Sequence, residues 1–298
     1  MKKWIVMLLV AALMLTAAAC GKKETGASGS NSGGKDTAGK PDSSTVDPAD
    51  TGKFDGLVVV DNDQFFMQIT GVGEDENGVC LLHCSMENRS EDMKWSFKAI
   101  DASVNSLACD PTLFETLYPG KAGEADITFS GKLGFEQMVG APTDIVVTIE
   151  IADGDDHNAA PAFEKEVHIY PDGKQNAVRY AREAGAKDVV LMDNEDFTIT
   201  MIDYREDAEW SGNVAVDLYI VNKTDKLLRI DGSDVFVNGE RGGYVWFLDL
   251  PAGSSGYENI HLYDDVELDD VKEITTRVVA QFKAEENQFF DETMTIRP

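Results

Sequence analysis

Two acidic pairs with the same spacing are the residues of this sequence that most directly suggest chemistry. Asp61 and Asp63 recur 132 positions later as Asp193 and Glu195. Two residues apart on a strand, both carboxylates of a pair share one face, so each pair could bind calcium or act as general acid and base. A solvated strand entrance explains the same residues without chemistry, and we favour that interpretation.

Other residues with catalytic or metal-binding chemistry do not combine into a known arrangement. The loop at residues 154–158 is rich in oxygen ligands but lacks the spaced Asp and terminal Glu of an EF-hand loop. Residues 253–256 lack the spacing of a nucleophile elbow, and an ion pair explains Glu166 and His168 on one strand face. The histidines have no zinc-binding spacing: they are His83, His157, His168 and His261. We therefore predict no enzyme and no cofactor, with calcium as the alternative to test.

The N-terminus has the pattern of a targeting segment. Lys2 and Lys3 precede an uncharged run, residues 4–19, which is too short to span a bilayer as a stable helix. Residues 15–20, Leu-Thr-Ala-Ala-Ala-Cys, resemble a bacterial lipobox and depart from it only at Ala17, where Leu is preferred. The resemblance implies a signal peptide at 1–19 and a diacylglycerol on the Cys20 thiol. An uncleaved anchor and an ordinary secretory signal are the alternatives.

The next segment, residues 20–53, is predicted to be the lipidated cysteine and a flexible tether. Val46 is its only large aliphatic residue, so it cannot bury enough apolar surface to offset the entropy of ordering. A flexible chain of this length has an end-to-end distance of about 32 Å. The formal net charge of −28 argues against a nucleic-acid partner, which requires basic groups to neutralise phosphates.

Residues 54–171 consist of short β-branched and aromatic runs separated by Gly, Asn, Asp and Pro, which is typical of strands and turns. Phe65, Met67 and Ile69 show the period of two expected of a half-buried strand. Further strands are predicted at residues 80–86, 125–129, 144–151 and 163–170. The stretch 58–69 as a whole is interpreted as the first strand of this region, with the acidic residues at its entrance.

Residues 188–298 repeat these landmarks in the same order. The matching segments are 58–69 with 190–201, 80–87 with 214–221, 88–91 with 222–225, 104–106 with 237–239, 118–121 with 250–253 and 167–171 with 294–298. Repeats of about 110 residues with seven or so short strands favour an all-β fold of two tandem immunoglobulin-like antiparallel β-sandwiches. Between them, the linker 172–187 fits either a short helix or an extended connector.

Three cysteines remain if Cys20 is lipidated. Cys80 and Cys84 lie about 13 Å apart on one strand face, too far to bridge each other. Either could pair with Cys109, but we favour buried, unpaired thiols for all three.

One aromatic strand provides the candidate partner surface. Tyr244, Trp246 and Leu248 alternate with Val245 and Phe247, so both faces of this strand are apolar. One face belongs to the core. If the other is exposed, the aromatic residues Tyr244, Trp246 and Phe247 could stack on sugars or receive a peptide, the alternative being burial under the neighbouring domain.

Taken together, the lipobox, the tether, the Asn turn at 221–225, the Asn-Gly hairpin at 237–239 and the Pro turn at 251–253 carry a family resemblance. The chain resembles the immunoglobulin-like lipoproteins of Gram-positive, often gut-dwelling bacteria, a tandem-repeat family of unknown function. Glu87 and Glu91 depart from the turn pattern in the first repeat. The resemblance implies a β-sandwich protein displayed on the cell surface and supplies no catalytic residues.

These observations predict a non-enzymatic lipoprotein anchored on the extracellular face of the cytoplasmic membrane. Its two sandwiches would bind or display a protein or glycan of the cell envelope or the host. A structural accessory of an envelope complex is the alternative, and a hydrolase using the paired carboxylates is a distant third.

Overall fold

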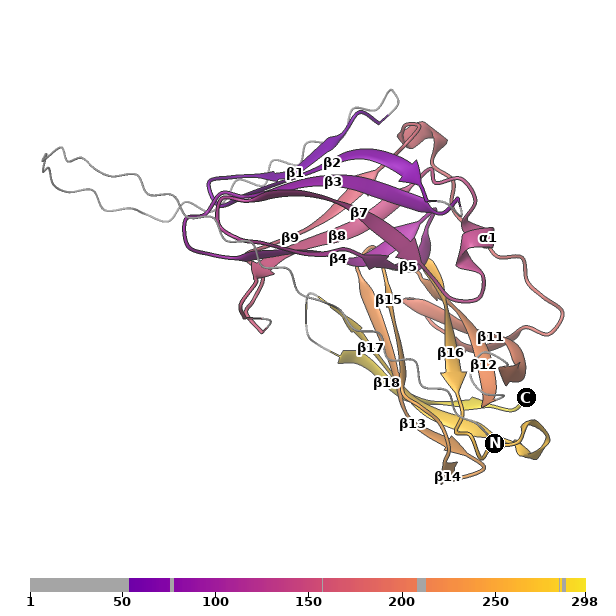
Figure 1. The fold of residues 1–298 in the computed structure, drawn as a ribbon. Helices are drawn as coiled ribbons and strands as arrows, with labels where there is room; N and C mark the ends of the chain where they lie inside the picture. The colour runs from indigo at the N-terminus through magenta and orange to yellow at the C-terminus, as the bar shows by residue number, and fades with distance from the viewer. Residues whose placement is uncertain (1–53, 76–77, 157, 208–212, 284, 286–287) are drawn as a thin grey trace, which may run out of the picture. The chain divides into compact units, whose positions relative to one another are not determined.

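The computed structural model describes residues 54–75, 78–156, 158–207, 213–283, 285 and 288–298. This part of the chain is all-β, as its residue pattern predicts (Figure 1). The N-terminal half contains β1 (Leu57–Asp61), β2 (Phe65–Glu74), β3 (Cys80–Asn88), β4 (Trp95–Val104), β5 (Leu107–Thr112), β6 (Phe114–Leu117), β7 (Ala122–Ser130), α1 (Phe135–Val139), β8 (Ile145–Asp153) and β9 (Phe163–Ile169). The C-terminal half contains β10 (Val189–Asp193), β11 (Phe197–Asp207), β12 (Asn213–Asn222), β13 (Leu228–Val237), β14 (Glu240–Arg241), β15 (Trp246–Leu250), β16 (Ser255–His261), η3 (Leu268–Asp270), β17 (Ile274–Phe282) and β18 (Gln288–Ile296).

Strand pairing follows the same order in both halves. In the N-terminal half, β1, β2, β3 and β7 lie side by side, while β8 and β9 form a second group with β4, which also pairs with β5 and β6 (Figure 1). In the C-terminal half, β10, β11, β12 and β16 lie side by side, and β13 pairs with β14, β15 and β17, with β18 beyond β17. β5 pairs with β4 through its first residues and with β7 through its last, so it connects the two groups.

Burial explains why these segments form strands. Phe65, Met67 and Ile69 are at most 2% exposed and alternate with partly exposed neighbours, which confirms the predicted period of two. Each half has its own apolar core, and each core collects side chains from both strand groups of that half. Phe65 and its counterpart Phe197 both point into these cores. The period-two pattern therefore places one face of each central strand inside.

The stretch 58–69 differs from the predicted single strand, because a turn divides it into β1 and β2. Asn62 makes this turn: its Oδ1 accepts hydrogen bonds from the backbone N–H groups of Gln64 and Phe65. Asn194 does the same for Asp196 and Phe197 between β10 and β11. An asparagine that bonds the backbone two and three residues ahead is a strong local turn former.

A buried asparagine fixes the end of β3 and another fixes the end of β12. Nδ2 of Asn88 donates to the carbonyls of Met93 and Leu117, both at 2.8 Å. Nδ2 of Asn222 donates to the carbonyls of Lys226, Leu250 and Pro251 at 2.8–3.0 Å. Asn222 is 1% exposed and Asn88 is fully buried. The predicted Asn turns are confirmed, and each amide also ties its strand to a distant one.

The predicted hairpin at 237–239 is also confirmed. Asn238 and Gly239 have φ of 52° and 89°, and Asn105 and Ser106 have φ of 52° and 64° at the matching turn between β4 and β5. Positive φ at both central residues is the geometry of the two-residue type I′ hairpin, for which Asn-Gly is preferred.

The linker 172–187 is an extended connector with a single turn of 3₁₀ helix, η1 (Lys174–Asn176). The propensity for a longer helix at 176–184 is overridden by contacts along the segment. The Tyr180 N–H donates to the carbonyl of Asn105 at 2.5 Å, and its hydroxyl hydrogen-bonds the Tyr257 hydroxyl at 2.5 Å. A parallel pair between Leu107 of β5 and Ser255 of β16 adds a backbone contact between the two halves.

Cys80, Cys84 and Cys109 are free thiols. Cys80 and Cys84 are buried, and burial raises the pKa of each to about 12. They act as small apolar side chains of the N-terminal core.

The predicted signal peptide (1–19), Cys20 and the tether (20–53) lie outside the described residues. Among the residues that are described, no helix has both the length and the apolar character needed to cross a bilayer.

Substituting Asn222 by leucine should lower the free energy of unfolding by about 3 kcal/mol, because buried carbonyls lose their donors. Urea denaturation with fitted midpoints measures the loss. Asn176→Leu is the matched control, since Asn176 is exposed and its side chain donates to the nearby carbonyl of Asp172. Equal, small effects of the two substitutions would contradict a structural role for the Asn222 amide.

Candidate functional site

The predicted aromatic surface is only partly present. Trp246 is 4% exposed and belongs to the C-terminal core, so it must be removed from that surface. Its indole lies directly over Gly232 of the paired strand, where a Cβ atom would be 1.9 Å from the ring. Tyr244 and Phe247 are exposed, at 45% and 56%, and Val245 between them is 72% exposed.

Phe247 has a counterpart in the N-terminal half that the sequence did not single out. In the N-terminal half Leu117 pairs with Trp95, and at the matching place in the C-terminal half Leu250 pairs with Leu228. Phe114 lies three residues before Leu117, and Phe247 lies three residues before Leu250, so the two phenylalanines occupy matching positions. Phe114 is 58% exposed.

A cation lies over each of these exposed rings. Lys98 Nζ is 6.0 Å from the Phe114 ring centre, and Arg229 Cζ is 4.7 Å from that of Phe247. Tyr118, 60% exposed, has Lys94 over its ring at 5.1 Å. Comparing the two repeats for aromatic residues could have found Phe114.

The acidic pairs lie at the turns between β1 and β2 and between β10 and β11. Asp61 Oδ1 is 2.6 Å from Arg89 Nη1, and Asp193 Oδ1 is 2.5 Å from Lys223 Nζ. The Lys223 hydrogen bond lowers the pKa of Asp193 below its ordinary value. The arrangement fits the solvated-entrance interpretation, in which one acid of each pair neutralises a nearby cation.

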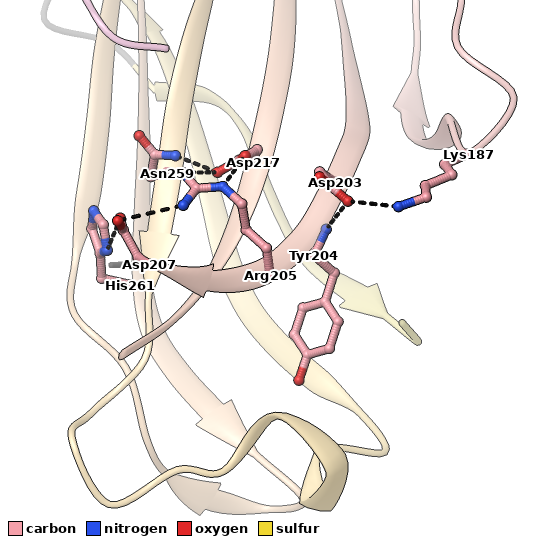
Figure 2. A network of polar contacts seen from close by, with 8 residues as sticks. All are labelled: Lys187, Asp203, Tyr204, Arg205, Asp207, Asp217, Asn259 and His261. Carbon is pink, nitrogen blue, oxygen red and sulfur yellow. Dashed lines mark hydrogen bonds and ion pairs between the residues drawn. The ribbon is translucent and has the colours of Figure 1, made fainter. Parts of the chain in front are cut away.

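A network of polar side chains covers the face of β12 opposite the core (Figure 2). Asp217 lies between two core residues, Val216 and Leu218, so strand alternation turns it away from the core. It is nevertheless only 4% exposed. Arg205 of β11 donates to both of its oxygens, from Nε at 2.8 Å and from Nη2 at 3.2 Å. Asn259 of β16 donates to Asp217 Oδ1 at 2.5 Å. The sequence signal that could have found this network was Asp217 itself, an aspartate inside an otherwise apolar strand.

The same network continues along β11 to a histidine. Arg205 Nη1 is 3.4 Å from Asp207 Oδ1, and His261 Nδ1 is 3.7 Å from Asp207 Oδ2 (Figure 2). Burial lowers the pKa of His261, although Asp207 acts in the opposite direction. The ion pair with Asp217 raises the pKa of Arg205. Near this network, at an exposed position, Lys187 Nζ donates a hydrogen bond to Asp203 Oδ1 at 3.3 Å.

The corresponding face of the N-terminal half is open. His83 of β3 pairs across the sheet with Asp126 of β7, as Asp217 of β12 pairs with Asn259 of β16. His83 Nδ1 is 2.8 Å from Asp126 Oδ1, and both side chains are about half exposed, at 52% and 47%. Beside them lies a hollow of about 460 Å³.

Among the described residues there is no cluster of three or more His, Cys, Asp or Glu suited to hold a metal ion. In the oxygen-rich loop, Asp155 pairs with Lys94 at 2.6 Å. His157 lies outside the described residues. His168 lies 3.1 Å from Glu166, the ion pair expected from their shared strand face.

We expect His261 to make stability depend on pH. Its folded-state pKa is below 6.5, so the unfolded chain binds the proton first. The stability from neutral His261 is therefore present above pH 6.5 and is lost as the pH falls from 6.5 through the lower folded-state pKa. Urea midpoints at about pH 7.5 and 5.5 should show a smaller acid-induced loss in His261→Gln than in the wild type.

His168 provides a control of opposite sign. The hydrogen bond with Glu166 raises its pKa, so its contribution is present below pH 6.5 and lost as the pH rises through the folded-state pKa. His168→Gln should therefore enlarge the acid-induced loss. Identical pH profiles of His261→Gln and the wild type would contradict the assignment.

Comparison with known proteins adds little. No family model matches the chain, and no curated protein matches it. Among solved structures, it is similar to the YadV chaperone, with 8% identity over 79% of this chain and 100% of that chain. The TM-score of 0.25 is too low for this likeness to support any statement about fold or function.

Proposed function

We propose that the protein is a non-enzymatic surface lipoprotein whose two immunoglobulin-like sandwiches bind a partner from the cell envelope or the host. The domains would be residues 54–171 and 188–298, joined by the linker 172–187. The observation that carries the proposal is the pair of exposed aromatic rings, Phe114 and Phe247, at matching positions in the two halves.

The strand order supports the immunoglobulin-like arrangement. That fold packs one sheet in the order A-B-E against another in the order G-F-C. In the N-terminal half, β2-β3-β7 and β9-β8-β4 follow these orders, and in the C-terminal half β11-β12-β16 and β18-β17-β13 do so. The register shifts at the matching positions 58/60 and 190/192 support a duplication.

The exposed rings support binding because a large aromatic side chain loses little entropy when it contacts a partner and contributes a large apolar area. Phe114 and Tyr118 are four residues apart, or about 13 Å in an extended chain. Thr116 lies between them and is half-buried, and its hydroxyl bonds the buried Ser96 hydroxyl at 2.9 Å. Two exposed rings at this spacing form a surface suited to stacking on a sugar chain or a peptide.

The polar clusters favour a structural role over catalysis. Arg205 and Asn259 both donate hydrogen bonds to Asp217. Asp61 and Asp193, the carboxylates first considered for hydrolysis, are engaged by Arg89 and Lys223. A catalytic carboxylate needs a pKa tuned to its task and access to substrate, whereas these residues act as partners of nearby cations.

The aromatic rings can be tested by removing them from each half separately. Phe114→Ser with Tyr118→Ser, and separately Phe247→Ser, should weaken binding to an envelope-extract ligand or an arrayed glycan at least about tenfold, as aromatic hot spots do. Val178→Ser is the matched control, because Val178 is an aliphatic side chain of equal exposure, 57%.

Binding that persists in the aromatic variants would contradict the proposed surface. If the wild type binds nothing in a pull-down from envelope extract and nothing on the glycan array, the binding function is contradicted and the structural accessory is favoured.

The lipid anchor has its own test. Substituting Cys20 by serine should move the protein from the membrane fraction to the soluble fraction, because two acyl chains provide stable anchoring and their loss removes it. Fractionation followed by immunoblotting measures the change, and Cys109→Ser is the control cysteine. Continued membrane retention of Cys20→Ser would contradict the lipoprotein assignment.

A further inference from the structure

The hollow on the N-terminal half lies on the face of β2, β3 and β7 opposite the core. Its lining includes Thr70, His83, Ser85, Glu124 and Asp126. Glu124 and Asp126 are two residues apart on β7 and therefore share this face, and both are exposed. The hollow thus offers two carboxylates, an imidazole and two hydroxyls within one concave region.

Strand register identifies what occupies the same positions in the C-terminal half. Ser85 pairs with Glu124, and the corresponding cross-strand pair is Tyr219 with Tyr257. Two large rings therefore fill the region where the N-terminal half has a small hydroxyl and a flexible carboxylate. Tyr219 and Tyr257 lie with ring centres 5.2 Å apart, and Tyr257 is only 8% exposed.

A cationic side chain also covers the C-terminal face. Arg205 of β11 corresponds to Gly73 of β2. Arg205 pairs with Ala215 of β12, and Gly73 pairs with Leu81 at the matching place on β3. Arg205 lies on Asp217, and Arg182 of the linker lies 5.7 Å from the Tyr219 ring centre. Two guanidinium groups thus lie on this face of the C-terminal half, both supplied by the chain itself.

At the N-terminal face the corresponding cation is missing from strand β2, because the residue at Arg205's position is Gly73. The ring of His83 occupies part of the space above this glycine, and a Cβ atom there would be 2.8 Å from His83 Nε2. Asp126 Oδ1 hydrogen-bonds His83 Nδ1 at 2.8 Å, and the carboxylate of Glu124 lies beside this pair. The formal charge of −28 further favours a cationic partner over an anionic one.

We propose that this hollow binds an arginine side chain of a basic segment on a partner protein, which takes the place that Arg205 fills internally in the C-terminal half. Glu124 and Asp126 accept hydrogen bonds from the guanidinium, whose planar fork suits carboxylates. Ser85 and Thr70 supply further acceptors at the wall. The residues of this site do not include the exposed aromatic rings, so the two proposals are tested independently.

The probe is a short glycine- and serine-rich peptide with one central arginine, and its control is the same peptide with citrulline. Citrulline keeps the shape of arginine but lacks the charge. Titration into the isotope-labelled protein should shift the His83 ring signals and the amides of Glu124 and Asp126 with the arginine peptide only. Shifts that are equal for both peptides, or that spread over the whole acidic surface, would overturn the proposal.

Two sets of variants separate specific binding from general attraction to an acidic protein. Glu124→Gln with Asp126→Asn should weaken peptide binding about tenfold, the combined effect of losing two partly exposed ion pairs. Glu136→Gln with Glu183→Gln makes the same change in net charge at exposed positions away from the hollow and should leave binding nearly unchanged. Equal weakening in both variants would overturn the proposal.

A transplant provides the strongest test. Gly73→Arg together with His83→Asp places the Arg205–Asp217 pair of the C-terminal half on the N-terminal face, and the second change removes the clash with the imidazole. This variant should fold, as judged by amide dispersion and melting temperature, and should lose peptide binding because its own guanidinium occupies the hollow. A folded transplant that binds the peptide as well as the wild type would overturn the assignment; if it does not fold, the carboxamide variant decides.

Discussion

The structure depends on two buried carboxamides, those of Asn88 and Asn222. Each is at the end of a central strand and is completely enclosed, so every donor and acceptor on it must be satisfied internally. Through Leu117 and Leu250, each amide connects its strand to the edge strand of the other group. This one interaction sets where the chain leaves the first group of strands, and therefore which residues of the following strands meet the core.

Much of the fold could be predicted because its signals are local. The alternation through Phe65, Met67 and Ile69 depends only on one face being buried, and the Asn238-Gly239 turn depends on backbone angles that few residues adopt. The turn at Asn62 was missed because the duplicated stretch 58–69 was interpreted as one strand, although Asp61, Asn62 and Asp63 are turn-forming residue types. The division of β5 between β4 and β7 has no local signal, since it arises from strands distant in sequence.

The candidate sites were less predictable, because exposure is a property of neighbouring strands. Trp246 and Phe247 are adjacent and similar in type, yet one packs over Gly232 and the other faces solvent. Their alternation was visible in the sequence, but which of them faced the core was not. Asp217 and His83 occupy matching positions, and their opposite exposure follows from their surroundings: Asp217 is bonded by Arg205 and Asn259, whereas His83 lines an open hollow.

The buried thiols of Cys80 and Cys84 give the molecule a built-in measure of strand separation. Only the thiolate reacts with alkylating reagents or oxidants, and a pKa near 12 leaves a thiolate fraction on the order of 10⁻⁵ at neutral pH. Reaction therefore requires that β3 first leave its neighbours and expose these side chains to water. The rate of labelling then reports the free energy of that local opening through native side chains, in a part of the sheet next to the hollow.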